Sequence, residues 1–372
     1  MRIGFDAKRA YFNRSGLGNY SRGVIQLMTE FQPTNNYFLY TPSGHDEITF
    51  PVYGKVKKIT PGTVFAKKMS SLWRTYLLAG QLKKDKIDVY HGLSNELPGR
   101  LRNTKMGKVV TIHDLIFFRY PEYYKSIDRQ IYARKTLYSC NIADKVIAVS
   151  EQTKRDVVEF LEIAPEKIEV VYQGCNPLYY PRLTEEIKKP IRDKYDLPSS
   201  FVLYVGTIEA RKNLLNVVKA MHTGGIDMPL LVVGKPTPYL ETVKQYIHEK
   251  KMEHVYLLHG VPLEDLPAIY QMATVFVYPS MFEGFGIPIL EALNSGVPVI
   301  TSKGSCFSEA GGKAALYTDP ESVGELTEAI RMVIGDSELR KKMITEGHQH
   351  TLKFRENIIS GRLMKIYKEV MK

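Results

Sequence analysis

Apolar residues recur along the chain in two alternating patterns. Short apolar runs predict buried strands of a parallel sheet, and stretches with apolar residues at helical spacing follow most of them. The expected strands lie at 1–6, 87–91, 108–112, 144–149, 168–172, 201–205, 230–234, 255–258, 273–278 and 297–301. Because strands and helices alternate in both halves, the pattern predicts an α/β protein with two doubly wound, parallel-sheet, Rossmann-like domains that face each other across a cleft.

The length of the chain also favours two domains, since 372 residues exceed the usual size of one. Residues 173–200 contain four prolines and few long apolar stretches, so they are interpreted as an interdomain linker. We therefore expect an N-terminal domain at 1–180 and a C-terminal domain at 181–354. A further helix is expected from about residue 355 to 371.

The composition is that of an ordinary soluble globular protein, with 44% hydrophobic and 24% charged residues. No apolar run approaches the roughly 20 residues that span a bilayer, and Asp6 within the first strand argues against a signal peptide. Cys140, Cys175 and Cys306 are odd in number and widely spaced, which favours reduced thiols over disulfides or a zinc site. A cytoplasmic location is expected.

Charge is distributed unevenly along the chain. Residues 1–180 hold 27 Lys and Arg against 17 Asp and Glu, whereas residues 181–372 hold 24 against 23. A basic half beside a neutral half predicts an anionic partner. That partner is an anionic membrane surface, a phosphorylated substrate or a nucleic acid, although no recognisable nucleic-acid motif occurs.

A helix expected at 64–82 offers one place for such a partner. Its apolar positions form one stripe at helical spacing, and lysines flank both ends; the stripe comprises Met69, Leu72, Trp73, Tyr76 and Leu77. Such a stripe belongs to the core in most helices. With basic ends and the only tryptophan, it could instead lie on a membrane surface.

The segment Glu283–Glu291 carries the strongest chemical signal. It follows the apolar run 273–278 and leads into an expected helix that has Pro288 in its first turn. Glycines in the loop let the backbone approach a ligand, and the first helical turn offers N–H groups to anionic oxygens. Two carboxylates at a site suited to anions indicate a ligand that is part phosphate and part polyol. The alternative is an ordinary turn with two solvated glutamates.

Two further segments lie at the expected carboxyl ends of strands. Arg211 and Lys212 follow the strand 201–205 at the mouth of a helix, where adjacent cations and helix N–H groups suit a diphosphate. His113 follows the strand 108–112, at the edge where open α/β sheets place ligands, or else it only caps and packs. Near the start, Gly16 and Gly18 form a loop that is a weak NAD fingerprint but a reasonable phosphate or sugar contact.

Together these segments resemble glycosyltransferase family 4, whose members are retaining, sugar-nucleotide-dependent transferases with the GT-B fold. The resemblance is carried by Gly16–Tyr20, Thr111–Asp114, Ala143–Ser150, Val205–Asn213 and the E-x7-E spacing of Glu283–Glu291. It runs almost from end to end. It implies that the last helix, at 355–372, crosses back to the first domain.

The resemblance implies roles for the residues around the donor diphosphate. Arg211 and Lys212, with Gly206 beside them, would bind the diphosphate and neutralise charge on the leaving nucleoside diphosphate. Gly16 and Gly18 would close over the phosphates. The family needs no metal, and the chain has no D-x-D tripeptide that would suggest one.

It also implies roles around the sugar. Glu283 would bind hydroxyls of the donor sugar, helped by the amides of Phe285 and Gly286. Glu291 would hold the ribose hydroxyls, and His113 would contact the transferred sugar. Transfer with retention is thought to occur on the front face of the donor, with the leaving phosphate accepting the acceptor's proton. The chain accordingly shows no obvious carboxylate pair of the glycosidase kind.

The opening Gly4–Arg9 and the Gly16 loop look most like bacterial mannosyltransferases of polysaccharide and O-antigen assembly. That resemblance favours GDP-mannose as donor, while UDP-linked hexoses and GDP-fucose remain open. A glycan acceptor on a polyprenyl diphosphate carrier would explain the basic first half, with the enzyme at the cytoplasmic leaflet. The alternatives are a sugar-nucleotide epimerase of the same fold and a basic nucleic-acid-binding protein.

Overall fold

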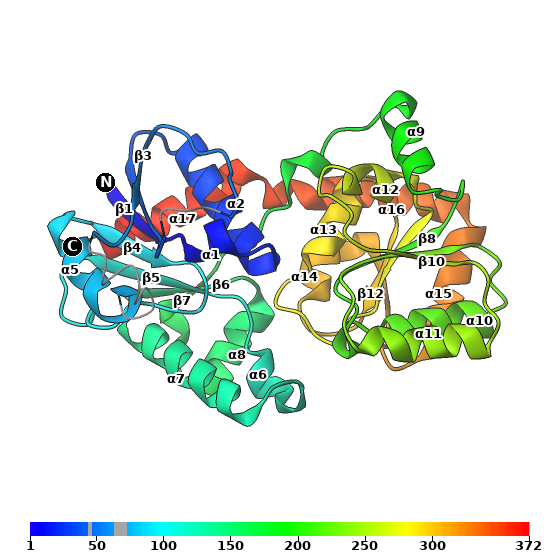
Figure 1. Ribbon diagram of the computed structural model, residues 1–372, viewed down its shortest axis with the longest axis horizontal. Helices are drawn as coiled ribbons and strands as arrows, with labels where there is room; N and C mark the ends of the chain where they lie inside the picture. Colours follow the sequence, from blue (N-terminus) through cyan, green and yellow to red (C-terminus); the bar gives the residue numbers. More distant parts are fainter. Residues whose placement is uncertain (44–46, 63–72, 372) are drawn as a thin grey trace. The chain divides into compact units, whose positions relative to one another are not determined.

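The chain forms two compact units, each with its own parallel sheet (Figure 1). The computed structural model describes residues 1–43, 47–62 and 73–371. Unit 1 consists of Met1–Gly174 together with Phe354–Lys372, and unit 2 consists of Cys175–Lys353. The boundaries therefore lie close to those expected at 180/181 and 354/355, and the prediction of two Rossmann-like α/β domains is confirmed.

Unit 1 is built on a seven-stranded sheet in the order β3-β2-β1-β4-β5-β6-β7, with every pair parallel. Its strands are β1 Arg2–Asp6, β2 Asn36–Tyr40, β3 Lys55–Ile59, β4 Val89–Gly92, β5 Gly107–Ile112, β6 Lys145–Ala148 and β7 Ile168–Val170. The sequence pattern missed β2 and β3. The edge strand β3 reads Lys-Val-Lys-Lys-Ile and is only partly buried. Lysines on an edge strand oppose pairing with a further strand.

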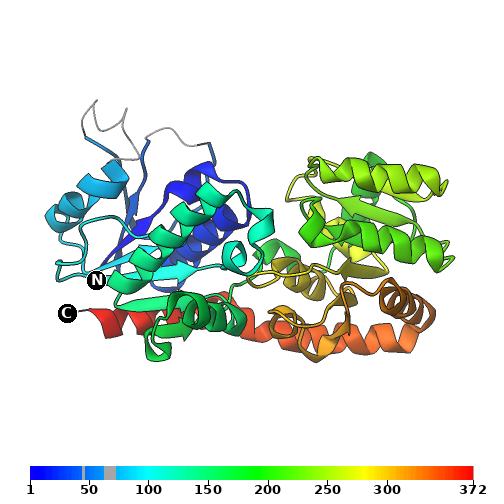
Figure 2. The same cartoon turned by 90° about the horizontal axis from the view of Figure 1, so that it is seen from below.

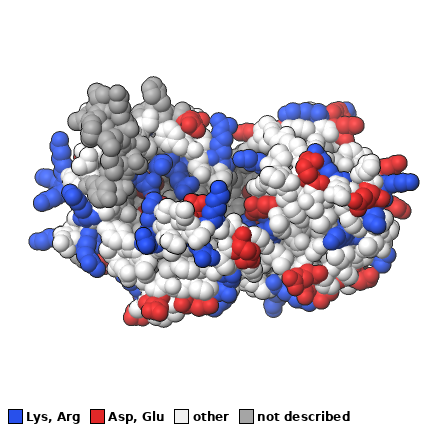
Figure 3. Space-filling view, turned by 60° about the horizontal axis from the view of Figure 1, so that its bottom comes forward, with Lys and Arg blue, Asp and Glu red and all other residues white. Residues whose placement is uncertain are grey.

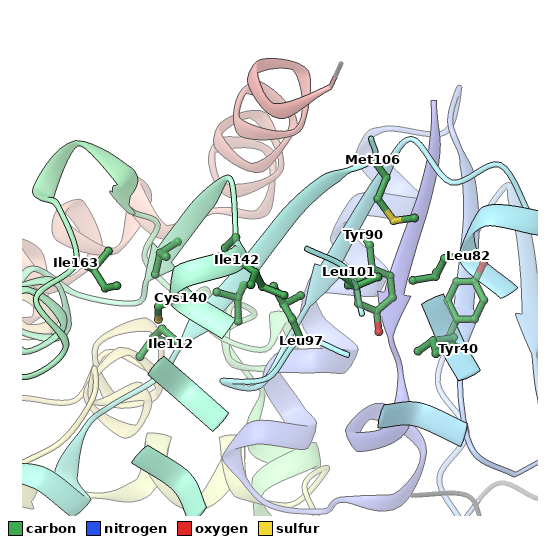
Figure 4. Close-up of a cluster of buried hydrophobic side chains, with 14 of the residues drawn as sticks. Tyr40, Leu82, Tyr90, Leu97, Leu101, Met106, Ile112, Cys140, Ile142 and Ile163 are labelled. Atoms are coloured by element: carbon green, nitrogen blue, oxygen red, sulfur yellow. The ribbon is translucent and has the colours of Figure 1, made fainter. Parts of the chain in front are cut away.

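Helices cover both faces of this sheet, and their apolar sides close the core. They are α1 Lys8–Phe12, α2 Gly16–Phe31, a π-helical turn Trp73–Leu77, α5 Leu78–Lys84, α6 Ile116–Arg119, α7 Ser126–Ile142, α8 Glu151–Leu161 and α17 Glu356–Val370. Figure 4 shows part of the core, where Tyr90 of β4 and Ile112 of β5 lie among side chains such as Leu101 and Ile142. Ser150 is the N-cap of α8, since its Oγ accepts from Thr153 N at 3.0 Å.

The structure decides against the membrane alternative for Trp73. Its side chain is 5% exposed and packs in the core of unit 1, so it offers no anchor on the surface. Leu77, from the same predicted stripe, is 52% exposed. Lys67, Lys68, Met69 and Leu72 lie outside the described residues.

Unit 2 has a six-stranded parallel sheet in the order β10-β9-β8-β11-β12-β13. The strands are β8 Val202–Val205, β9 Leu230–Val233, β10 Val255–Leu258, β11 Val275–Tyr278, β12 Val299–Ser302 and β13 Ala315–Thr318. The order reverses between β8 and β11, which are direct neighbours although β9 and β10 lie between them in sequence. In open α/β sheets this switch point, at the carboxyl edge, is where ligands bind.

The helices of unit 2 flank its sheet. They are α9 Glu185–Lys194, α10 Leu214–Thr223, α11 Tyr239–Glu249, α12 Leu266–Met272, α13 Ile287–Asn294, α14 Phe307–Gly311, α15 Val323–Gly335 and α16 Ser337–Thr351. Helix α15 begins at Val323. Ser322 is its N-cap, because Ser322 Oγ accepts from Glu325 N at 3.2 Å.

The segment 173–200 is predicted to be a linker, and that prediction is wrong for Glu185–Lys194. Helix α9 forms there despite Pro190, supported by ion pairs one turn apart, Lys188 with Glu185 and Lys189 with Asp193. Its end is tied to unit 2 by Lys194, whose Nζ lies 2.7 Å from Asp265. Proline content pointed to a linker, but the charge spacing within the segment favours a helix.

Candidate active site

The predicted donor-site residues of unit 2 gather at its switch point. Arg211 and Lys212 form a 3-10 turn between β8 and α10, and Glu283 lies in the loop between β11 and α13. Since β8 and β11 are adjacent parallel strands, their carboxyl ends meet at one edge. The backbone ties the two loops together, because Met281 N donates to Arg211 O at 2.8 Å.

Glu283 is the hub of this cluster. Its Oε1 lies 2.9 Å from Arg211 Nη1 and 3.3 Å from Lys212 Nζ, and it accepts hydrogen bonds of 2.9 Å from Tyr278 and Ser280. Burial by itself raises the pKa of this carboxyl, but the two cations and the two hydroxyl donors outweigh it and lower the pKa to about 2. Glu283 is therefore ionised throughout the physiological pH range.

The two cations are held in fixed positions. Arg211 donates to the carbonyl of Phe282 and to Glu209 Oε1, the latter at 2.7 Å. Burial acts to lower the pKa of the Arg211 guanidinium, but the nearby carboxylates Glu283 and Glu209 raise it overall. Lys212 Nζ donates to Tyr278 Oη at 2.9 Å and also lies 5.2 Å from the centre of that ring.

The cluster keeps some access to solvent. The side chains of Arg211 and Lys212 are each 15% exposed and that of Glu283 is 14% exposed. Among the described residues, Tyr278 and Glu283 take two of the three ammonium donors of Lys212. One donor of this lysine is thus left for a ligand oxygen.

Glu291 lies in a different environment, one turn into α13. Its Oε2 accepts a hydrogen bond of 3.0 Å from Tyr270. Burial raises the pKa of this carboxyl to about 7, against the lowering effects of the Tyr270 hydrogen bond and the charge of Lys212. The two carboxylates of the E-x7-E segment therefore differ, since Glu283 is held ionised and Glu291 titrates near neutral pH.

The glycines predicted near the donor shape the backbone here. Gly286 has φ of +101° as the residue before α13, a conformation that other residues adopt only with strain. A Cβ on Gly206 would lie 3.3 Å from Lys212 Cδ, so this position leaves room for the lysine side chain. Phe285 is buried, which leaves its backbone rather than its ring as the group that could meet a ligand.

A third loop fixes the backbone of Glu283. After β12, Ser305 Oγ and Cys306 Sγ both donate to Glu283 O, each at 3.2 Å. Cys306 is fully buried, and burial raises the pKa of its thiol, so the sulfur stays protonated and keeps donating. Cys140, Cys175 and Cys306 are free thiols, as expected from their spacing.

In unit 1, His113 follows β5 as predicted and is 6% exposed. Its Nε2 lies 2.9 Å from Leu93 O, and the ring of Tyr20 meets it edge-on with centroids 4.5 Å apart. Burial lowers the pKa of His113 to about 4, so the ring is neutral at pH 7. Because a carbonyl only accepts, Nε2 carries the hydrogen and Nδ1 is left as an acceptor.

The first predicted loop, also in unit 1, contains two glycines with different surroundings. A Cβ on Gly16 would meet nothing within 4 Å, whereas one on Gly18 would lie 1.8 Å from Asn13 O. Gly18 therefore lets α2 pack against the preceding loop. Asn13 orders that loop by accepting from Ser15 N at 2.7 Å.

Sequence reasoning missed several residues that hold the unit 2 cluster. Glu209 contacts Arg211, and Tyr270 contacts Glu291. Tyr278 contacts both Lys212 and Glu283, and Ser280 contacts Glu283. The available signal was position, since Tyr278 ends a buried apolar run and Ser280 lies two residues after it. The structure brings together the predicted residues of unit 2, whereas His113, Gly16 and Gly18 belong to unit 1.

The described residues contain neither a metal-ligand cluster nor a membrane-spanning helix. Among residues 1–43, 47–62 and 73–371, no group of three or more His, Cys, Asp and Glu is arranged to hold a metal ion. Within the same ranges, no helix has the length and apolar content needed to cross a bilayer.

Comparison with known proteins gives matches along most of the chain. Residues 21–177 match the family model described as Glycosyltransferase Family 4, and residues 187–350 match the one described as Glycosyl transferases group 1. The O-antigen chain mannosyltransferase B of Escherichia coli is 28% identical over 385 residues, covering 99% of this chain and 100% of that protein. The O-antigen chain mannosyltransferase RfbU of Salmonella typhimurium is 29% identical over 228 residues, covering 61% of this chain and 60% of that protein.

Solved structures show the same fold. The sucrose-phosphate synthase of Thermosynechococcus elongatus superposes with a TM-score of 0.80 at 19% identity, covering 99% of this chain and 98% of that one.

Proposed function

We propose that this chain, which belongs to glycosyltransferase family 4, transfers mannose from GDP-mannose to a glycan acceptor, with retention at the anomeric carbon and without a metal ion. The observation that carries the proposal is the cluster of Arg211, Lys212 and ionised Glu283 at the switch point of unit 2. It combines cations for a diphosphate with a carboxylate for sugar hydroxyls. That combination suits a sugar nucleotide.

The leaving group determines what the cations do. In the transfer, the bond from the anomeric carbon to the donor phosphate breaks and a bond to the acceptor oxygen forms on the same face. The acceptor's proton passes to an oxygen of the leaving diphosphate. Arg211 and Lys212 stabilise the negative charge that develops there, and their fixed positions mean that little reorganisation is needed.

The carboxylates and the histidine are proposed to position the donor. Glu283 accepts hydrogen bonds from hydroxyls of the sugar, with the amides of Phe285 and Gly286 nearby. Glu291 accepts from the ribose hydroxyls in its ionised form, which donor binding would favour. His113, neutral and with Nδ1 free to accept, contacts the transferred sugar.

The choice of mannose rests on the two O-antigen mannosyltransferases to which the chain is similar. The acceptor is proposed to be a glycan on a polyprenyl diphosphate carrier at the cytoplasmic leaflet. Unit 1 supports this, since it contains 32 Lys and Arg against 19 Asp and Glu, while unit 2 contains 19 against 21. Figure 3 shows Lys and Arg prevailing over unit 1 on the face drawn.

A donor screen tests the proposal. GDP-mannose should raise the melting temperature of the full chain more than UDP-glucose or GDP-fucose does, since a ligand of the native state stabilises it. With an acceptor glycan, GDP should be released and the product should keep the anomeric configuration of the donor, in the presence of EDTA. GDP release that needs no acceptor, or a UDP-sugar that stabilises the protein more strongly, would contradict the proposal.

A further inference from the structure

Helix α7 exposes an unusual amount of apolar surface for a helix that packs on a sheet. Its exposed large apolar side chains are Ile127 at 73%, Ile131 at 45%, Tyr132 at 44%, Leu137 at 40% and Tyr138 at 37%. Figure 2 looks onto the side of unit 1 that α7 covers. Because exposing isoleucine side chains to water is unfavourable in free energy, we expect a partner to cover this surface.

Three of the exposed apolar residues lie on one side of the helix. At about 100° per residue, Ile127, Ile131 and Tyr138 lie within about 40° of one another. The buried residues Thr136 and Cys140 point in the opposite direction, toward the core of unit 1. The exposed apolar stripe therefore lies on the side of α7 opposite to the residues that the fold buries.

Cations accompany the exposed stripe. Arg134 lies at an angle of about 40° from its centre and Lys135 about 60° on the other side, while Asp128 lies farther out, at about 80°. Lys135 is partly compensated by Glu96, with Nζ and Oε1 3.3 Å apart. The net charge near the stripe is positive, on a unit that is itself strongly basic.

A hollow adjoins the carboxyl-terminal end of the stripe. It has a volume of about 210 Å³ and is lined by Arg134, Lys135 and Tyr138 on the side of α7, with Leu97 and the Arg74–Glu96 ion pair opposite. Its combination of cations and apolar walls suits the phosphate and glycerol of a lipid headgroup.

We propose that the outer face of α7, defined by Ile127, Ile131, Arg134, Lys135 and Tyr138, docks on an anionic lipid bilayer. Isoleucines would enter the interface, tyrosine would lie at headgroup level, and the cations would meet lipid phosphates. A second copy of the chain fits less well, because two strongly basic units repel each other. The inference rests on the lipid-linked acceptor of the proposed function, and it replaces Trp73 as the membrane contact.

Vesicle binding of the full chain tests this surface. The wild type should co-sediment with vesicles of phosphatidylcholine containing 30% phosphatidylglycerol, more weakly with phosphatidylcholine alone, and more weakly at high salt. Ile127→Ser combined with Ile131→Ser should lower the partition coefficient about tenfold or more. Arg134→Ala should lower it about fivefold.

Matched controls lie in unit 2. Ile187 and Met332 are 49% and 54% exposed, so Ile187→Ser with Met332→Ser removes a similar apolar area elsewhere and should leave vesicle binding unchanged. Both double variants should keep the melting temperature of the wild type and its rise with GDP-mannose. This last measurement separates the two proposals, because donor binding does not depend on α7.

Three results would overturn the inference. The wild type fails to bind the anionic vesicles; the α7 variant binds them as well as the wild type does; or the wild type forms a dimer that the α7 variant abolishes while vesicle binding is unchanged. Loss of the GDP-mannose effect with intact vesicle binding would refute only the donor assignment.

Discussion

The carboxylate of Glu283 should stabilise unit 2 strongly, and Glu283→Gln removes its charge while keeping its shape. In the variant, Arg211 and Lys212 lose the counter-charge that both contact, in a position where each is only 15% exposed. Cations that lack a counter-charge and have little access to solvent lower the stability of the folded state. We therefore expect a clear loss of stability as well as of donor binding.

The magnitude follows from the pKa of Glu283. Folding lowers this pKa from 4.5 to about 2, and each unit corresponds to about 1.4 kcal/mol, so the ionised carboxylate contributes about 3 kcal/mol to stability at pH 7. For a unit of this size, such a loss lowers the melting temperature by roughly 6 to 12 °C. Calorimetry of the full chain measures the shift in the transition of unit 2.

The pH dependence has a definite sign. Because the folded-state pKa lies below the unfolded-state value, the contribution is complete above about pH 4.5 and is lost as the pH falls toward 2. The stability difference between wild type and Glu283→Gln should therefore shrink from about 3 kcal/mol at pH 7 to about 2 kcal/mol at pH 3.5.

Glu209→Gln is the matched control for this experiment. Glu209 also contacts Arg211, at 2.7 Å, but its side chain is 37% exposed. Its removal should cost less than about 1 kcal/mol. The reasoning is refuted if Glu283→Gln melts within 2 °C of the wild type at pH 7, or if the difference stays constant down to pH 3.5.

Three further substitutions probe the same cluster. Lys212→Ala should lower kcat at least about 100-fold through loss of charge stabilisation. The control Lys303→Ala, at an exposed ion pair, should leave kcat unchanged, and equal rates in both variants would show that Lys212 has no part in the mechanism. Tyr278→Phe should lower kcat/KM about tenfold with little change in melting temperature, because the Tyr278 hydroxyl positions both Lys212 and Glu283. A kcat/KM equal to that of the wild type would contradict this role. Glu291→Gln should weaken GDP binding yet raise the free energy of unfolding at pH 8 by about 1 to 3 kcal/mol. Because folding raises the pKa of Glu291 to about 7, its ionisation destabilises the folded state as the pH rises from 4.5 through 7. A wild-type unfolding curve that does not move between pH 6 and 8 argues against a raised pKa.

Much of the fold could be predicted because the central strands are buried on both faces. Strands such as β9 and β11 therefore read as apolar runs. The misses have local causes. Strand β3 alternates lysine with apolar residues at a sheet edge, and the rule that proline breaks helices hid α9, where Pro190 is tolerated in an exposed helix with its own ion pairs.

For the site, sequence position predicted the charged side chains but not the residues that hydrogen-bond to them. The carboxyl ends of parallel strands share an edge, so Arg211 and Glu283 could be placed near each other from sequence. That Tyr278 bridges Lys212 and Glu283 depends on side-chain directions that no periodicity encodes. The different ionisation of Glu283 and Glu291 likewise arises from neighbours distant in sequence, such as Tyr270 for Glu291.

Helix α17 gives the molecule a particular order of assembly. It belongs to unit 1, where the buried Tyr367 hydroxyl lies 2.7 Å from His91 Nδ1 and Val370 packs where Gly107 has no side chain. During synthesis, all of unit 2 is translated before this helix. Unit 1, although it begins first, can therefore complete its fold only after all of unit 2 has been translated, because the groove beside β4 and β5 stays open until α17 is present. A released chain that ends at residue 353 should contain a protease-resistant unit 2 and a protease-sensitive unit 1.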